Sequence, residues 1–325
     1  MLDVLVIGAG PAGLAAGIAA RTHGLHYLIV ERGSLVNSLL HYPTNMVFFT
    51  TPELLEVGGL PFVSPYEKPT RQEALRYYRR VADTFELEIA FSEPVTGLHR
   101  AADGDFRVTS QPAGAEPRLR QTRTVVVATG AFDRPNLLGI PGEDLAHVSH
   151  YYGEPHPYYR RRVVVVGGKN SAAEAALDLY RNGVTVTLVH RGERLADSIK
   201  YWVLPDIENR IKEGSIAGKF STSVVEITSE EVVLDGPDGR ARVAADAVLL
   251  LTGYHSDPTL LRTAGADLDP ASGAPLHHPD TFETSVPGLF VVGACVAGRE
   301  SGRIFIENGR FHGAMAVKEI ARRLS

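Results

Sequence analysis

DVLVIGAGPAGLAAGIAARTHGLHYLIVE, residues 3–31, is the stretch that decides the fold of this 325-residue chain. Its opening apolar run predicts a strand that is buried on both faces. The G-x-G-x-x-G that follows places Gly8 at a sharp turn, Gly10 where a pyrophosphate can approach the backbone, and Gly13 where the next helix packs on the strand. That helix, expected over residues 11–21, directs its first amides toward the phosphates. The stretch therefore predicts a βαβ unit that binds a dinucleotide.

A carboxylate completes this pattern. The second apolar run of the stretch ends at Val30, and Glu31 follows about 20 residues after the glycines, where an acid in such units binds the ribose hydroxyls. A glycine motif by itself would be weak support. Here strand, turn, helix, strand and acid occur in the required order, so we expect Glu31 to contact a ribose.

Composition excludes several classes of protein. The chain has 44% apolar residues and a formal net charge of -5, and it carries no long basic run. We therefore expect no nucleic acid and no membrane as partner. No apolar run is as long as a membrane span, and the chain opens directly on a predicted buried strand, so a cytoplasmic protein is expected. The single cysteine, Cys295, excludes a C-x-x-C pair and a cysteine-rich metal site, and we expect no metal.

The opening pattern repeats in the second half of the chain. Residues 161–172, RRVVVVGGKNSA, again predict a strand, a glycine turn and the start of a helix. Lys169 stands where the strict motif has glycine. Its place at a helix N-terminus favours contact between its ammonium and a phosphate, with a surface lysine in a variant turn as the alternative. Two βαβ units predict two dinucleotides, one in each domain.

The second repeat ends on basic residues instead of an acid. The strand expected over residues 184–189 is followed by His190, Arg191 and, three residues further on, Arg194. A carboxylate at this point selects a free 2′-hydroxyl, whereas arginines accept a 2′-phosphate. The pattern favours NADPH over NADH. The alternative is an exposed strand end with ordinary arginines.

These repeats define the expected organisation. The fold class is α/β, with two Rossmann-like dinucleotide-binding domains, the second inserted into the first. Residues 1–133 and 257–325 are expected to form the first domain and residues 134–256 the second. Residues 41–52, HYPTNMVFFTTP, lack a regular period and are expected to be a loop, either a packed connection or a lid over a planar ring.

Other elements follow from periodicity. Helical spacing predicts a helix over residues 70–85, whose arginines form a solvated face, and a last helix within residues 304–324. Short strands are expected at residues 88–91, 94–98, 106–109, 125–130, 223–227, 231–234, 246–251 and 290–295, with turns at 111–117 and 236–239.

With two fingerprints, the chain resembles over its whole length the low-molecular-weight thioredoxin reductases, in which FAD occupies the first domain and NADPH the inserted one. A finer resemblance is to the YpdA-type bacillithiol-disulfide reductases. Four segments carry it: HYPT with FF at residues 41–44 and 48–49, GGKNSA at 167–172, KYWVLPDIENR at 200–210, and IFIENGRFHG at 304–313. Two features depart from these families: the second domain has no C-x-x-C, and Ala12 stands where YpdA-type proteins commonly have cysteine.

The resemblance implies a cytoplasmic, NADPH-dependent flavoprotein that forms a homo-oligomer and reduces the disulfide of a small thiol, with a redox protein as a further candidate partner. Together with the fingerprints it implies two sets of contacts. FAD is expected at Gly8, Gly10, Pro11, Ala12, Gly13, Glu31, Arg32, Ser38, His41, Thr44, Val95, Ala128, Thr129, Gly130, Gly293, Ala294, Ile304 and Phe305. NADPH is expected at Gly167, Gly168, Lys169, Asn170, Ser171, Ala172, His190, Arg191, Arg194 and Gly253.

No catalytic residue is identified from the sequence. Cys295 is the only thiol, and because its surroundings read as an apolar strand, a buried structural role is favoured over catalysis. His41, His255 and His312 lie near flavin-type segments and are candidate proton donors, although an ordinary core or surface role is favoured for each. Two other functions fit the same pattern. One is a ferredoxin or flavodoxin–NADP reductase, which a cationic patch near the flavin would favour. The other is a nucleotide-binding redox sensor, which very slow turnover would favour.

Overall fold

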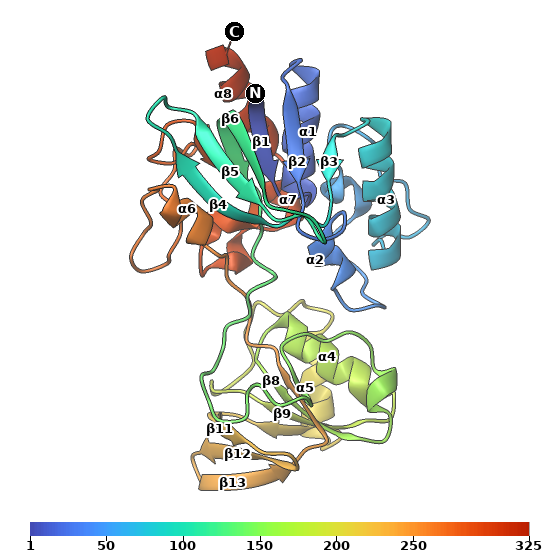
Figure 1. Cartoon of the computed structure of the whole chain (residues 1–325). Coiled ribbons are helices and arrows are strands. Elements are labelled where there is room, and N and C mark those ends of the chain that lie inside the picture. The colour runs from blue at the N-terminus through green and yellow to red at the C-terminus, as the bar shows by residue number, and fades with distance from the viewer. Residues whose placement is uncertain (325) are drawn as a thin grey trace. The chain divides into compact units, whose positions relative to one another are not determined.

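A computed structural model describes residues 1–324 and divides the chain into two compact units (Figure 1). Unit 1 comprises Met1–Leu40, Met46–Arg134 and the chain from Tyr254 onward, and unit 2 comprises His41–Asn45 and Pro135–Gly253. The expected domain boundaries, 133/134 and 256/257, lie close to two of these junctions. The assignment of residues 41–45 to unit 2 was not expected, because nothing in the sequence pattern separates them from the first domain.

A parallel sheet forms the centre of unit 1, in the order β3–β2–β1–β6, with β15 paired to the far side of β6. Val4, Leu5 and Val6 are fully buried, as expected for a strand covered on both faces. Because these strands are parallel, their carboxyl ends lie at one edge of the sheet. The strands are β1 (Leu2–Ile7), β2 (Tyr27–Val30), β3 (Ile89–Ala90), β6 (Arg118–Val127) and β15 (Leu289–Val291).

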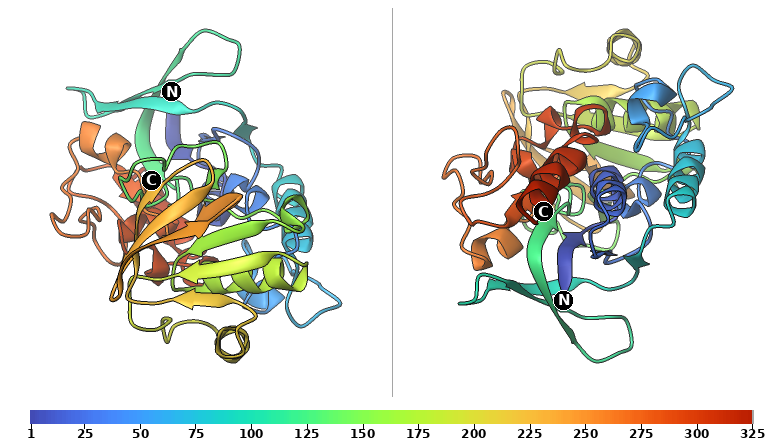
Figure 2. Two further views of the ribbon diagram at one scale, coloured as in Figure 1. Left: turned by 90° about the horizontal axis from the view of Figure 1, so that it is seen from below. Right: turned by 90° about the horizontal axis from the view of Figure 1, so that it is seen from above.

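Two helices and an antiparallel blade cover the two faces of this sheet. Helices α1 (Pro11–Thr22) and α8 (His312–Leu324) lie side by side on one face, and β4 (Val95–Arg100) and β5 (Phe106–Ser110) lie on the other (Figures 1 and 2). The blade is completed by the first half of β6. The sequence predicted only the second half of this strand, because residues 118–123 face solvent on one side and show no apolar run.

The remaining helices of unit 1 are short, apart from α3 (Arg71–Thr84). The predicted helix over residues 70–85 is confirmed, and Thr70 and Glu73 form a capping box at its start. The last helix is divided into α7 (Ile306–Gly309) and α8. Helices α2 (Asn37–Leu40) and α6 (Thr259–Thr263) and the 3₁₀ turns Pro52–Leu55, Gly293–Ala297 and Ser301–Arg303 complete unit 1.

Unit 2 has a parallel sheet in the order β10–β9–β8–β14–β7. Alternate valines of β8 pack into two different hydrophobic cores. Val163 and Val165 pack with residues of α4 and α5, whereas Val164 and Val166 pack with residues of β11 and β12. The elements are β7 (Val148–Ser149), a 3₁₀ turn (His156–Tyr158), β8 (Arg162–Val166), α4 (Asn170–Arg181), β9 (Thr185–Val189), α5 (Leu204–Lys212), β10 (Ala217–Lys219), β11 (Ser223–Ile227), β12 (Glu231–Gly236), β13 (Gly239–Ala244) and β14 (Ala247–Leu250).

A buried carboxylate joins the blade of unit 1 to the parallel sheet. The Glu93 side chain is 2% exposed; Arg120 and Ser110 donate to it, and Arg118 lies 3.4 Å away. The Glu93 N–H donates to the Glu31 carbonyl at 2.9 Å, so the cluster lies at the end of β2. Burial raises the pKa of Glu93, but the hydrogen bonds from Arg120 and Ser110 more than offset it, and the pKa lies below its usual value.

Glu93→Gln is expected to lower the free energy of unfolding by about 3 kcal/mol at pH 7, because Arg120 loses its counter-charge in a mostly buried position. The wild-type carboxylate contributes this stability above the pKa of an unfolded glutamate, about 4.3, and loses it as the pH falls through the lower folded-state value. Urea denaturation measured from pH 7 downward should show the two proteins converging.

The control for this prediction is Arg118→Met, which removes the more exposed partner of the same carboxylate. Its cost should stay below about 1 kcal/mol, as for exposed ion pairs. A Glu93→Gln protein as stable as wild type at pH 7 would contradict the prediction.

Candidate functional site

The first glycine turn is closely packed at Gly8 and Gly13 and open at Gly10. Gly8 has φ +109°, and a Cβ placed on it would lie 2.5 Å from the Ala128 carbonyl oxygen. A Cβ on Gly13 would lie 1.9 Å from the Gly8 oxygen, so the start of α1 touches the turn directly. At Gly10, apart from the adjoining backbone, no heavy atom of residues 1–324 lies within 4 Å of the Cβ position. The turn is therefore a cradle whose open side faces the first amides of α1, which have no partner within the helix.

Glu31 is held beside this turn. The side chain is buried, and its two carboxylate oxygens accept hydrogen bonds from the Ala9 and Gly33 N–H groups, each at 2.8 Å. A carboxylate oxygen has two acceptor positions, so each retains one for a ligand hydroxyl. The geometry places the carboxylate where the sequence expected it, and its contact with a ribose stays a prediction.

Two strand ends bring further predicted residues to the same edge. Ala128, Thr129 and Gly130 follow β6, and Gly293 and Ala294 follow β15. The Thr129 hydroxyl is buried and has no hydrogen-bond partner among the described residues. Because buried polar atoms are normally paired, this hydroxyl fits a polar ligand atom.

Other predicted residues adjoin this edge through their neighbours. Ser38 lies in α2, two residues after Val36, whose N–H donates to the Ala9 carbonyl at 3.1 Å. Val95 begins β4, and Arg32 forms an ion pair with Asp133 at 2.7 Å.

The segment before α7 reaches the edge on the β15 side. A Cβ on Gly309 would lie 3.1 Å from the Ile304 side chain and 3.4 Å from the Gly293 Cα. Phe305, in contrast, is 60% exposed. The sequence did not single out Arg310, at the C-terminal end of α7, which donates to the Glu53 and Glu56 carbonyls and ties that end of the helix to the chain before α3.

Two predicted FAD residues fall in the other unit. His41 and Thr44 belong to unit 2, where the Thr44 N–H donates to the Gly153 carbonyl at 2.8 Å. Their contact with FAD stays a prediction.

Cys295 lies in a 3₁₀ turn, so its expected place in a strand is wrong; β15 ends at Val291 because the chain turns at Gly293, whose φ is +73°. The thiol is buried, and its Sγ lies 2.9 Å from the Val292 carbonyl oxygen. Burial raises the pKa of Cys295 to about 11, so the thiol stays protonated at neutral pH. It has neither the exposure nor the charge of a reactive thiolate.

The second glycine turn, in unit 2, packs against different groups. A Cβ on Gly167 would lie 2.6 Å from the Leu251 oxygen, and one on Gly168 would lie 2.2–2.5 Å from the His190 ring. The imidazole therefore lies directly against the turn. Lys169 is exposed at the N-cap of α4, where a cation can reach a phosphate bound to the first amides.

The basic end of β9 is open to solvent. Arg191 and Arg194 are exposed, and Arg194 pairs through both guanidinium nitrogens with Asp197. Burial, and the nearby Arg191, lower the pKa of His190, so this side chain is neutral at pH 7. A bound 2′-phosphate would compete with Asp197 for Arg194.

The remaining predicted NADPH residues have structural contacts. Asn170 accepts from the Lys200 N–H at 2.9 Å and donates to the Ser198 carbonyl at 3.3 Å, so it fastens the following loop to the start of α4. Ala172 is buried against Gly167, and Ser171 is exposed. The sequence indicated the position of Asn170 but not this role. Gly253 lies at the end of unit 2 and accepts from the Asn136 N–H.

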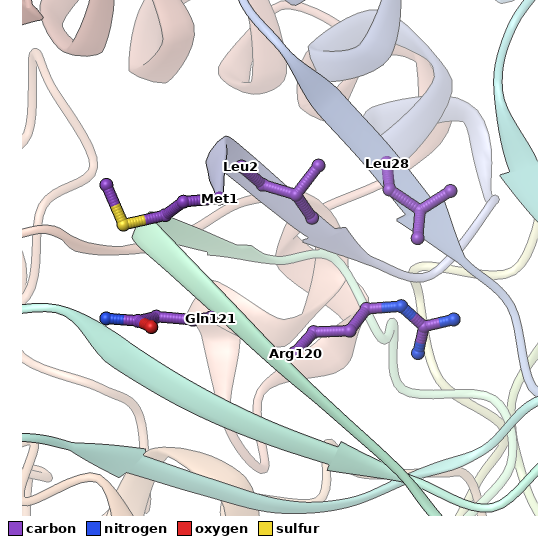
Figure 3. Close-up of a pocket in the computed structure, with 5 residues that line it drawn as sticks. All are labelled: Met1, Leu2, Leu28, Arg120 and Gln121. Atoms are coloured by element: carbon purple, nitrogen blue, oxygen red, sulfur yellow. The ribbon is translucent and has the colours of Figure 1, made fainter.

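A shallow cavity of about 370 Å³ lies at the opposite end of the unit 1 strands (Figure 3). Met1, Leu2 and Leu28 line one side, and Arg120 and Gln121 line the other. Because the cavity lies at the opposite end of the strands, it is not part of the dinucleotide site. The Arg120 guanidinium that lines it is already bonded to Glu93 and Ser110.

Within residues 1–324, no helix has the length and apolar character needed to cross a membrane. Over the same residues, no cluster of three or more histidine, cysteine or acidic side chains is arranged to hold a metal ion.

The chain belongs to the pyridine nucleotide-disulphide oxidoreductase family, which its sequence matches over residues 5–293. It is 40% identical to the bacilliredoxin reductase Bdr of Bacillus subtilis (strain 168), over 98% of this chain and 97% of that protein. The structure is similar to that of the bacillithiol disulfide reductase Bdr (YpdA) from Bacillus cereus, with a TM-score of 0.97, 38% identity and 99% of each chain covered. Thioredoxin reductase from T. acidophilum, 18% identical with a TM-score of 0.78 over 99% of this chain and 98% of that one, shares the fold.

The family makes this protein an FAD-dependent oxidoreductase that uses NAD(P)H, on the predicted two-domain α/β fold. The residues of unit 1 fit FAD on their own geometry. The cradle is open at Gly10, the Thr129 hydroxyl has no partner within residues 1–324, and the two Glu31 oxygens accept one backbone hydrogen bond each.

Gly10→Ala is expected to weaken FAD binding by at least about tenfold, equivalent to about 1.4 kcal/mol, because the added methyl occupies the space left for the pyrophosphate. The fold should be unaffected, since the backbone at Gly10 has φ −75° and ψ 176°, which alanine adopts readily. Titration of apoprotein with FAD measures the affinity, and thermal unfolding of apoprotein measures stability.

Gly97→Ala in β4 is the control, because its Cβ would lie at an ordinary contact distance, 3.5 Å, from the Thr109 side chain. It should bind FAD as wild type does. Normal FAD affinity in Gly10→Ala would place the pyrophosphate elsewhere.

Proposed function

We propose that this protein catalyses the NADPH-dependent reduction of a low-molecular-weight disulfide of the bacillithiol-disulfide type. The single observation that supports this most is the match over almost the full length of both chains to the B. subtilis protein at 40% identity. The names of that protein and of its B. cereus counterpart give bacilliredoxin and bacillithiol disulfide as what those proteins act on. A redox protein is accordingly a second candidate acceptor for this chain.

The reaction is RSSR + NADPH + H⁺ → 2 RSH + NADP⁺. The S–S bond breaks, the disulfide gains two electrons and two protons, and the nicotinamide loses a hydride. FAD, when bound, relays the two electrons between the nicotinamide and the disulfide. In our proposal unit 1 holds FAD through its glycine cradle and Glu31, and unit 2 holds NADPH at the start of α4.

No thiol of the protein takes part in the proposed reaction. Cys295 is buried and protonated at neutral pH, and Ala12 stands in the first turn of α1. The substrate disulfide therefore receives electrons without forming a mixed disulfide with the chain. The protein contributes binding, orientation and exclusion of water.

The preference for NADPH is assigned to the end of β9. Arg191 and Arg194 are exposed beside the glycine turn and can bind a 2′-phosphate, and no acidic residue stands at the ribose position. We also propose that the protein is cytoplasmic and forms a homo-oligomer.

The test is anaerobic stopped-flow absorbance with NADPH and then with bacillithiol disulfide. The flavin band should bleach with NADPH and recover with the disulfide, and Cys295→Ala should do the same. Bleaching without recovery would remove this substrate and point to a ferredoxin or flavodoxin as acceptor. Slow turnover with every acceptor would favour a redox sensor.

Arg191→Ala and Arg194→Ala are each expected to raise KM for NADPH roughly tenfold, because each removes a charge-assisted hydrogen bond to the 2′-phosphate. KM for NADH should change by less than about twofold. Arg181→Ala is the control, since this arginine is at the far end of α4 and pairs with Asp206. Equal effects on the two coenzymes would refute the 2′-phosphate role.

A further inference from the structure

Three rings form a stack behind the β15 end of the proposed FAD site. His277 stacks on Phe282 with centroids 5.7 Å apart, and Phe282 stacks on His312 at 4.1 Å. Phe282 is buried and has φ +61°, a conformation that bulky residues rarely adopt. Its backbone N–H donates to the His278 carbonyl, and its carbonyl accepts from the Val291 N–H. The backbone thus holds the central ring against His312.

His312 also makes a polar contact. The Gly293 N–H donates to His312 Nδ1 at 3.3 Å. An N–H group can only donate, so Nδ1 carries no proton, and the neutral ring bears its proton on Nε2. Burial and the neighbouring His277 lower the pKa of His312 to about 4, which keeps Nδ1 an acceptor at neutral pH. This favours an accepting role for Nδ1 over the proton-donor role considered from sequence.

Gly293 packs closely against the first turn of α1. Its φ is +73°, and a Cβ on it would lie 2.8 Å from the Ala12 Cβ. Ala12 belongs to the first turn of α1, where the amides face the expected phosphates. On the other side, a Cβ on Gly309 would lie 3.4 Å from the Gly293 Cα. Gly293 is therefore enclosed between α1 and α7, and its backbone forms part of the wall at the edge of the cradle.

We propose that His312 is a positioning residue for the FAD site, whose Nδ1 holds the Gly293 N–H and thereby fixes residues 293–294 against the first turn of α1. The inference rests on the proposed placement of FAD in unit 1. It assigns the Gly293 N–H to the protein interior. Of the two residues that follow the strand end at this edge, Gly293 and Ala294, only Ala294 then has its amide available to FAD.

Three variants of His312 distinguish the roles of its two ring nitrogens. His312→Asn places an acceptor where Nδ1 lies, His312→Gln places one where Nε2 lies, and His312→Leu has none. FAD affinity, measured by titration of each apoprotein, should fall about three- to tenfold in the Gln and Leu variants, the range expected for one hydrogen bond. The Asn variant should stay within about twofold of wild type, and its bound-flavin spectrum should match wild type.

His277→Leu is the control for the stack, because it removes an outer ring but no bond to Gly293. It should bind FAD as wild type does. Equal affinity of the Asn and Gln variants would overturn the proposal, even if the Leu variant does not fold. Equal losses in all three variants would also overturn it, since the ring itself would then be what matters. Wild-type protein that binds no FAD would instead refute the proposed function.

Discussion

The contact between two backbones at Gly8 and Gly13 is the constraint on which unit 1 depends. A single methyl on Gly13 would overlap the Gly8 oxygen, so α1 can begin only where both residues are glycine. This contact brings the amides of α1 to the carboxyl edge of the sheet. The ends of β2, β6 and β15 arrive at the same edge because the strands are parallel. The dinucleotide site is therefore a consequence of sheet topology as much as of the motif.

Unit 2 meets the same geometric requirement with different chemistry. Its turn is closed by the Leu251 carbonyl under Gly167 and by the His190 ring against Gly168, and Lys169 replaces the second glycine of the motif. In unit 1, β2 is followed by a buried carboxylate that accepts hydrogen bonds from two backbone amides. In unit 2, β9 is followed by exposed arginines. One repeat thus provides acceptors for hydroxyls and the other provides donors for a phosphate, which suits two different nucleotides.

The absence of a reactive thiol shapes the proposed chemistry. Cys295 packs beneath the end of β15, where burial favours the neutral thiol. The chain can then act on a disulfide only by holding it and the cofactors in contact. Precise placement of the wall around the cradle becomes correspondingly important, and the bond between His312 and Gly293 is one means of providing it.

Local pattern alone determined the two βαβ units, the helix Arg71–Thr84 and the positions of Glu31 and the glycine turns, because hydrophobic periodicity and glycine spacing act within a few residues. It could not determine where His41–Asn45 pack, that Cys295 lies in a turn, or that Arg194 pairs with Asp197. Nor could it pair His312 with Gly293. These features depend on side-chain direction and on contacts between segments distant in the chain. Only tertiary packing decides such contacts, because burial and hydrogen-bond partners are set by the neighbours that the fold supplies.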